Sequence, residues 1–170
     1  MGWLRRWRRR RLGEEMAARR YGEVVAWARD PILYARYGVP DTPEGRFEML
    51  VLHLVAAACG LRRAGEETLA QALVDLFFAD LDRSLREMGV GDLSVGRQVK
   101  RLGELFLARS RRLSAALAGG GDGEADVVDL LRRNLPMLEM DGATAIARRL
   151  FDLADHCTRS AARKATTGAI

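Results

Sequence analysis

Apolar residues recur at intervals of three and four positions along almost the whole chain. This spacing places them on one face of an α-helix, and the β-branched residues that favour strands are sparse. The pattern predicts an all-α protein, a single-domain helical bundle of about six helices with a basic N-terminal arm. The expected helices cover residues 14–29, 43–64, 66–88, 94–117, 124–135 and 142–160.

Capping residues set the expected helix ends. Thr42 is followed by Pro43, a pair typical of the N-cap and first position of a helix. Gly65 can adopt the left-handed conformation that closes the preceding helix. Ser94 or Asp92 is expected to cap the fourth helix, and the sequence AGGGDG at residues 118–123 predicts a flexible linker.

The longest apolar run extends from Phe47 to Leu61 and contains Glu48, His53 and Gly60. It is shorter than the ~18 residues that a membrane-spanning helix needs. Because it is apolar on nearly all sides, the run predicts a helix at the centre of the bundle.

Charge is unevenly distributed. The net charge is +5, but residues 1–20 alone carry eight arginines and two glutamates. We therefore divide the chain into a basic amphipathic arm (1–20), a helical domain (21–160) and a C-terminal tail (161–170). The domain is nearly neutral, which argues against a nucleic-acid-binding fold and against DNA as a partner.

The arm interleaves tryptophan with arginine. A helix would place Trp3 and Trp7 on one face, an arrangement typical of segments that lie on an anionic membrane. The same arginines could bind the phosphates of ribosomal RNA. A solvated terminus and a mitochondrial presequence are alternatives. The residues expected to bind the membrane or ribosome are Trp3, Arg5, Arg6, Trp7, Arg8, Arg9, Arg10 and Arg11.

Residues suited to metal binding or nucleophilic catalysis are few. Cys59, Cys157, His53 and His156 lack metal-ligand spacing, so we expect no metal site and no cofactor. Two cysteines without CxxC or metal-ligand spacing favour a reduced, intracellular compartment. The glycines of residues 91–96 follow a predicted helix instead of a strand, which excludes a phosphate loop.

An acidic cluster, Asp75, Asp80 and Asp82, lies on the third predicted helix. A helical wheel places Asp80 on the apolar face, where it needs a partner. The expected partners are Arg46, His53, Arg97 and Lys100. We interpret the cluster as a structural or partner-binding network and keep catalysis by Asp80, Asp82 and His53 as an alternative. On the fourth helix a cationic sector, either a solvated face or a docking surface for an acidic partner, contains Arg97, Lys100, Arg101, Arg111 and Arg112.

Two blocks of sequence carry a resemblance to a known family. They read DPILYARYGVPDTPEGRF at residues 30–47 and DLFFADLDRSLREMGVGDLSVGRQVK at residues 75–100. The blocks resemble those of the ubiquinol–cytochrome c chaperone family, whose members are assembly factors of the cytochrome bc complex. The resemblance spans residues 30–109, and the sequence after Leu117 departs from the family pattern. Arg97 stands where a lysine is expected.

The resemblance implies an all-helical protein without enzymatic activity that binds newly made cytochrome b. In mitochondrial relatives it implies a small helical partner protein and a place near the ribosomal exit. Together with the cationic sector, it marks as partner-binding Tyr34, Asp41, Arg46, Asp75, Asp80, Asp82, Arg86, Glu87, Asp92, Arg97 and Lys100.

We therefore predict an assembly factor that binds nascent or newly inserted cytochrome b. The expected location is the cytoplasm, peripheral at the inner membrane of a bacterium, or the mitochondrial matrix if the source is eukaryotic. A membrane- or ribosome-tethered adaptor for another membrane protein is the alternative.

Overall fold

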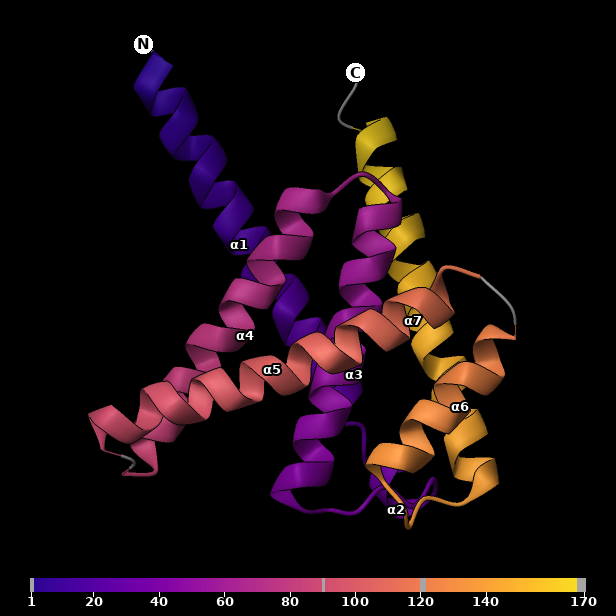
Figure 1. Ribbon diagram of the computed structural model, residues 1–170. Helices are drawn as coiled ribbons and strands as arrows, with labels where there is room; N and C mark the ends of the chain where they lie inside the picture. Colours follow the sequence, from indigo (N-terminus) through magenta and orange to yellow (C-terminus); the bar gives the residue numbers. More distant parts are fainter. Residues whose placement is uncertain (1, 90, 120–121, 168–170) are drawn as a thin grey trace.

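A computed structural model describes residues 2–89, 91–119 and 122–167; of residues 2–12, 92–93 and 164–167 it describes the backbone alone. The described ranges contain helices and no strand (Figure 1). The prediction of an all-α domain is confirmed. The helices are α1 (Gly2–Ala28), α2 (Pro31–Ala35), α3 (Pro43–Arg63), α4 (Glu67–Glu87), α5 (Asp92–Leu117), α6 (Gly123–Asn134) and α7 (Met140–Thr167).

Helix α3 forms the centre of the bundle. It packs against α1, α4, α5 and α7, and α6 fills the space between α5 and α7 (Figure 1). The consecutive residues Leu52, His53 and Leu54 are all fully buried, so α3 is covered on every side. The apolar run that predicted a central helix is therefore explained by packing in the bundle, and no described helix is long and apolar enough to cross a bilayer.

A glycine allows α3 and α7 to approach closely. A Cβ atom at Gly60 would collide with the main-chain carbonyl of Ala154 on α7. Thr158, one turn further along α7, donates a hydrogen bond of 2.9 Å from its hydroxyl to the Gly60 carbonyl. Small residues at this crossing thus replace side-chain packing with direct backbone contact.

Two predicted helix ends are confirmed, and one is wrong. Thr42 Oγ1 accepts a hydrogen bond from the Gly45 amide at 3.2 Å, and Gly65 has φ of 80°. The cap of α5, however, is Gly91, without a side-chain cap bond. The amides of Ser94 and Val95 both donate to the Gly91 carbonyl, so the helix already begins at Asp92.

Three helical segments differ from expectation. Helix α1 begins at Gly2, well before residue 14, and Figure 1 shows its N-terminal part extending beyond the body. Pro31 follows the end of α1 and also begins α2, which was not predicted, because Asp30 accepts a hydrogen bond from the Ile32 amide. Helix α7 continues past Ser160 to Thr167 through an alanine-rich sequence that favours helix.

Candidate protein-binding surfaces

The first family block folds into a compact polar cluster beside α2. Arg46 Nε donates to Asp41 Oδ1 at 2.6 Å, and its guanidinium carbon lies 6.0 Å from the centroid of the Tyr34 ring. The Tyr34 hydroxyl donates to the carbonyl of Ala28 at 2.8 Å. Three residues predicted to bind a partner are thus held together by contacts from α1, α2 and the start of α3.

This cluster is exposed and charged. The hydrogen bond from Arg46 holds the pKa of the Asp41 carboxyl below its usual range, so the ion pair is present at neutral pH. The cluster lines a surface hollow of about 610 Å³, and Arg29 lines this hollow as well. Arg29, the Arg46–Asp41 ion pair and the ring of Tyr34 can together bind a polar peptide segment. The fixed positions of these charges would make such binding specific for a segment of matching charge pattern.

Asp80 has polar partners, but the four partners predicted for it are wrong. Its side chain is 43% exposed, and it faces α1, where the Tyr21 hydroxyl donates to Oδ2 at 3.1 Å. Arg83 on its own helix lies 3.7 Å from the other carboxylate oxygen. The four expected partners are not the ones observed, because α4 turns this position toward α1 and away from α3 and α5.

The other two aspartates of α4 bond within their own helix. Asp75 accepts a hydrogen bond from Gln71 at 2.9 Å, and Asp82 pairs with Arg86 at 2.7 Å. Each partner lies four positions away, so both contacts run along the helix surface. Asp75, Asp80 and Asp82 therefore do not form one network.

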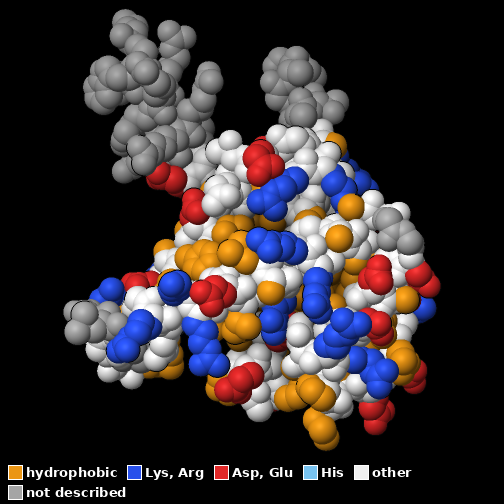
Figure 2. Space-filling model, viewed as in Figure 1, with side chains coloured by type: hydrophobic (Ala, Val, Ile, Leu, Met, Phe, Trp, Pro, Cys, Tyr) orange, Lys and Arg blue, Asp and Glu red, His pale blue; other side chains and the backbone are white. Residues whose placement is uncertain are grey.

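The α4–α5 turn exposes the remaining predicted residues. Glu87, Arg97 and Lys100 are exposed, and the side chain of Asp92 lies outside the described residues. Arg101, Arg111 and Arg112 are exposed as well, so the cationic sector of α5 is a solvent-facing surface (Figure 2). An exposed charged face can steer an oppositely charged partner.

Beside this cationic sector lies an apolar hollow of about 540 Å³ between α3, α4 and α5. Phe78 and Phe106 form part of its lining, with ring centroids 5.5 Å apart, and behind them Phe77 stacks on Phe106 at 5.6 Å. Leu107 on the rim is 55% exposed. Leu107 was not predicted as a surface residue; the signal in the sequence is that Glu104 and Arg111, each about one turn away on α5, share its polar face.

A buried ion pair links three helices and was also missed. Glu48 on α3 is 5% exposed; it pairs with Arg109 of α5 at 3.2 Å and accepts a hydrogen bond from Asn134 of α6 at 2.6 Å. A carboxylate in a core requires such partners. Its place inside an apolar run was the only signal in the sequence, and the partners come from distant segments.

His53 does not belong to an acid–base site with the aspartates of α4. It is fully buried, and its Nδ1 lies 2.7 Å from the Met49 carbonyl, which fixes that nitrogen as the donor. Burial lowers the pKa of His53 to about 4, so the ring is neutral at pH 7. The charges that affect it belong to Arg149 and Asp30.

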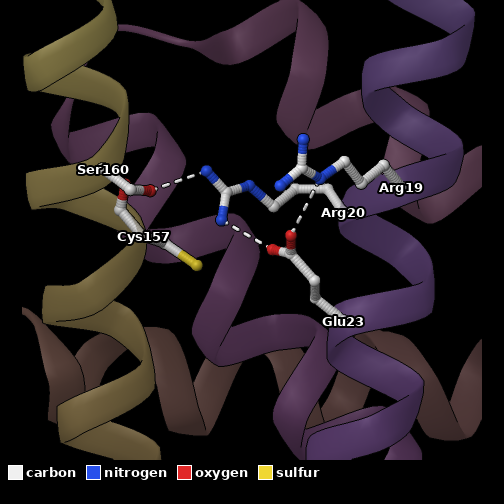
Figure 3. Close-up of polar contacts among 5 residues, drawn as sticks. All are labelled: Arg19, Arg20, Glu23, Cys157 and Ser160. Carbon is white, nitrogen blue, oxygen red and sulfur yellow. Dashed lines mark hydrogen bonds and ion pairs between the residues drawn. The ribbon is translucent and has the colours of Figure 1, made fainter.

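The described part of α1 is anchored to α7 by a polar contact (Figure 3). Arg20 donates to Glu23 and to Ser160 Oγ, each at 2.7 Å, and Arg19 lies 3.4 Å from Glu23. The Cys157 thiol points toward this group, and burial raises its pKa. The contact fixes the base from which the N-terminal part of α1 extends.

The side chains of residues 2–12, the first part of the predicted arm, lie outside the described residues. They include all eight residues expected to bind a membrane or ribosome: Trp3, Arg5, Arg6, Trp7, Arg8, Arg9, Arg10 and Arg11. Their backbone is part of α1.

Comparison with solved structures adds a close relative. The crystal structure of the Cbp3 homolog from Brucella abortus is 35% identical to this chain, with a TM-score of 0.75. The match covers 91% of this chain and 87% of that one. No curated protein matches.

A family model described as ubiquinol-cytochrome C chaperone matches residues 35–163. The match continues through α6 and α7, so the expectation that the sequence departs from the family after Leu117 is wrong. Those two helices complete the core around α3, which explains why the family pattern includes them. The chain belongs to the ubiquinol-cytochrome c chaperone family.

Proposed function

We propose that this protein is an assembly factor that binds newly made cytochrome b during assembly of the ubiquinol–cytochrome c oxidoreductase complex. The observation that carries the proposal is the family match over residues 35–163, supported by the similarity to the Cbp3 homolog. In this proposal the protein acts by binding; the acid–base alternative is not supported by His53, which is neutral and buried apart from the aspartates of α4.

Two surfaces support client binding. One is the Tyr34–Asp41–Arg46 cluster, and the other is the exposed face formed by the end of α4 and the start of α5. Arg97 and Lys100 give the second surface a positive potential, and the hollow beside it offers apolar contact. Charge at such a surface sets partner choice and the association rate more than affinity.

The N-terminal arm is the proposed tether to an anionic inner membrane or to the ribosome. Its arginines suit a surface of phosphates, and tryptophan is favoured at the headgroup level. Tethering would raise the local concentration of the protein where a membrane client emerges. A small helical protein is a further proposed partner, and a membrane- or ribosome-tethered adaptor for another membrane-protein client is the alternative function.

Crosslinking in cells tests the proposal. A tagged protein is crosslinked in a respiring strain, and captured peptides are identified by mass spectrometry; cytochrome b must be among them. Arg97→Glu combined with Lys100→Glu should lower its capture severalfold. The matched control is Arg132→Glu with Arg133→Glu on α6, which are equally exposed cations. Normal bc complex in a strain lacking the protein would refute the function.

A further inference from the structure

A second apolar groove lies on the opposite flank of α4, where that helix diverges from α1. Its volume is about 620 Å³. Along α4 its floor consists of Leu69, Ala72, Leu76 and Ala79. These positions are spaced three, four and three apart, which is the seam that a helix presents to another helix.

The groove presents an apolar strip that is long enough to contact one more helix. Met16 on the α1 side is 38% exposed, and Leu69, Ala72 and Leu76 remain partly exposed. Alanine at two of the four floor positions allows a helical backbone to approach closely. The floor from Leu69 to Ala79 is about 15 Å long, which corresponds to about three helical turns.

The described charged residues that line this groove are acidic. Among the residues whose side chains the structure describes (13 onward on α1), the charged ones that line it are Glu14, Glu66 and Asp75. Gln71 donates a hydrogen bond to Asp75 but does not neutralise its charge.

The two flanks of α4 therefore differ in charge. The charged residues that line the hollow between α3, α4 and α5 are Lys100, Glu104 and Arg62, which pairs with Glu67 at 3.0 Å, whereas the described charged residues that line the groove beside α1 are all acidic. An apolar helix with flanking cations therefore suits the groove beside α1 better than the hollow, where its cations would face Lys100.

We propose that the groove between α1 and α4 binds a cationic, apolar-faced helical segment of a membrane protein, adjacent to one of its membrane spans. This inference rests on the proposed function, because it takes the client to be a membrane protein. Loops of such proteins on the cytoplasmic side carry an excess of lysine and arginine. An amphipathic helix lying in an apolar groove is a common mode of recognition.

A binding measurement with the full-length chain tests the groove itself. The probe is a labelled peptide of about fourteen residues, long enough to span the groove floor, with leucines three and four apart and lysines elsewhere, read by fluorescence anisotropy. Its partner probe replaces every lysine with glutamate. The lysine peptide should bind at least about tenfold more tightly, and added salt should weaken its binding.

Variants locate the binding. Glu66→Lys combined with Asp75→Lys should weaken the lysine peptide at least about tenfold. Ala72→Trp, which fills the groove, should do the same with the helical circular dichroism unchanged. Asp129→Lys on α6, an exposed carboxylate 68% open to solvent, is the control and should leave binding unaltered. Equal binding of both peptides, or no effect of the charge reversals, would overturn the inference.

The arm of a second copy is the competing occupant, because it too combines arginine with apolar residues. Sedimentation of the full chain and of a chain lacking residues 2–12 separates the two. A dimer that dissociates on truncation, together with stronger peptide binding by the truncated chain, would assign the groove to that arm and overturn the proposal.

A photo-crosslinker at Ala79 separates this inference from the proposed function. Adducts with lysine- and arginine-rich segments of cytochrome b would support both. Cytochrome b captured from α5 but never from Ala79 would overturn the groove assignment alone. Absence of cytochrome b from every position would refute the function, while the peptide measurement would still decide what the groove binds.

Discussion

The hydroxyl of Tyr21 and the carboxylate of Asp80 meet at 3.1 Å, and this contact links α1 to α4. Burial of the Tyr21 ring and the charge of Asp80 raise the pKa of the phenol well above its usual range, so it remains a donor under all physiological conditions. The bond lies on the flank of α4 that also forms the groove beside α1. It therefore helps set the angle at which the two helices diverge.

Breaking this bond should lower stability modestly. Tyr21→Phe removes the donor, and we expect the free energy of unfolding to fall by about 1 kcal/mol, because the carboxylate remains partly hydrated. Asp80→Asn should cost a similar amount. Urea unfolding of both single variants and of the double variant measures the coupling.

In that double-variant cycle the losses should be less than additive. The matched control is Tyr37→Phe, a half-buried tyrosine beyond α2 that does not contact Asp80. Strictly additive losses would mean that the Tyr21–Asp80 contact contributes nothing to the packing of α1 on α4.

Helix type and most helix ends could be predicted from the sequence because they depend on neighbours in the chain. The spacing of apolar residues marked α3 as central, and Thr42 and Gly65 mark its ends through local hydrogen bonds and backbone conformation. Helix α2 was missed because its five residues are too few to show a period; it is held by the Asp30 cap.

The side-chain partners could not be predicted because they depend on how helices cross. A helical wheel placed Asp80 near apolar residues, but it cannot show that Tyr21, fifty-nine positions away, covers that side. Glu48 bonds to residues on α5 and α6 for the same reason. Pairs a few positions apart in the chain, such as Asp41–Arg46 and Asp82–Arg86, lie within reach of local reasoning.

Substitution of the buried Glu48 should lower the stability of the fold strongly. Glu48→Ala leaves Arg109 and Asn134 without their acceptor, and the free energy of unfolding should fall by about 3 kcal/mol. Glu48→Gln keeps an acceptor for Asn134 and should cost less. Thermal or urea unfolding measures both.

An exposed carboxylate on the same helix serves as the control for these variants. Glu44→Gln lies in the first turn of α3 and should change stability by less than about 0.5 kcal/mol. If Glu48→Ala were equally mild, the buried pair would not stabilise the contact of α3 with α5 and α6.

The buried His53 should make the folded protein less stable in mild acid. Its pKa is about 4 in the folded protein because the ring is buried, whereas an unfolded chain binds the proton near the ordinary value of 6.5. Between these values the unfolded state holds more protons, so stability falls as pH drops from about 6.5 toward 4, by at most about 1.4 kcal/mol per pH unit.

Comparison with His53→Leu isolates this contribution, because other groups also titrate in acid. The leucine variant should retain its helical circular dichroism and lose less stability than the parent between pH 7 and pH 5. Parallel pH dependence in the two proteins would show that the histidine is hydrated or already protonated in the native state.

Removal of residues 2–12 should abolish membrane binding and leave the fold intact. Gly13, Glu14, Glu15 and Met16 are all exposed, and the first buried position described on α1 is Ala17, so the truncated chain keeps the packing of α1 on α3 and α4. The thermal midpoint should change by no more than a few degrees, since surface changes rarely exceed about 0.5 kcal/mol.

Membrane binding should depend on the arm. Vesicles that contain anionic lipid should bind the full chain but not the truncated chain, and sedimentation of the vesicles measures the bound fraction. Replacing Arg8–Arg11 with glutamine should weaken binding in part and make it less sensitive to salt, because each arginine near an anionic surface contributes about 1 kcal/mol. Vesicle binding that survives the truncation would place the membrane contact on the helical body and not on the arm.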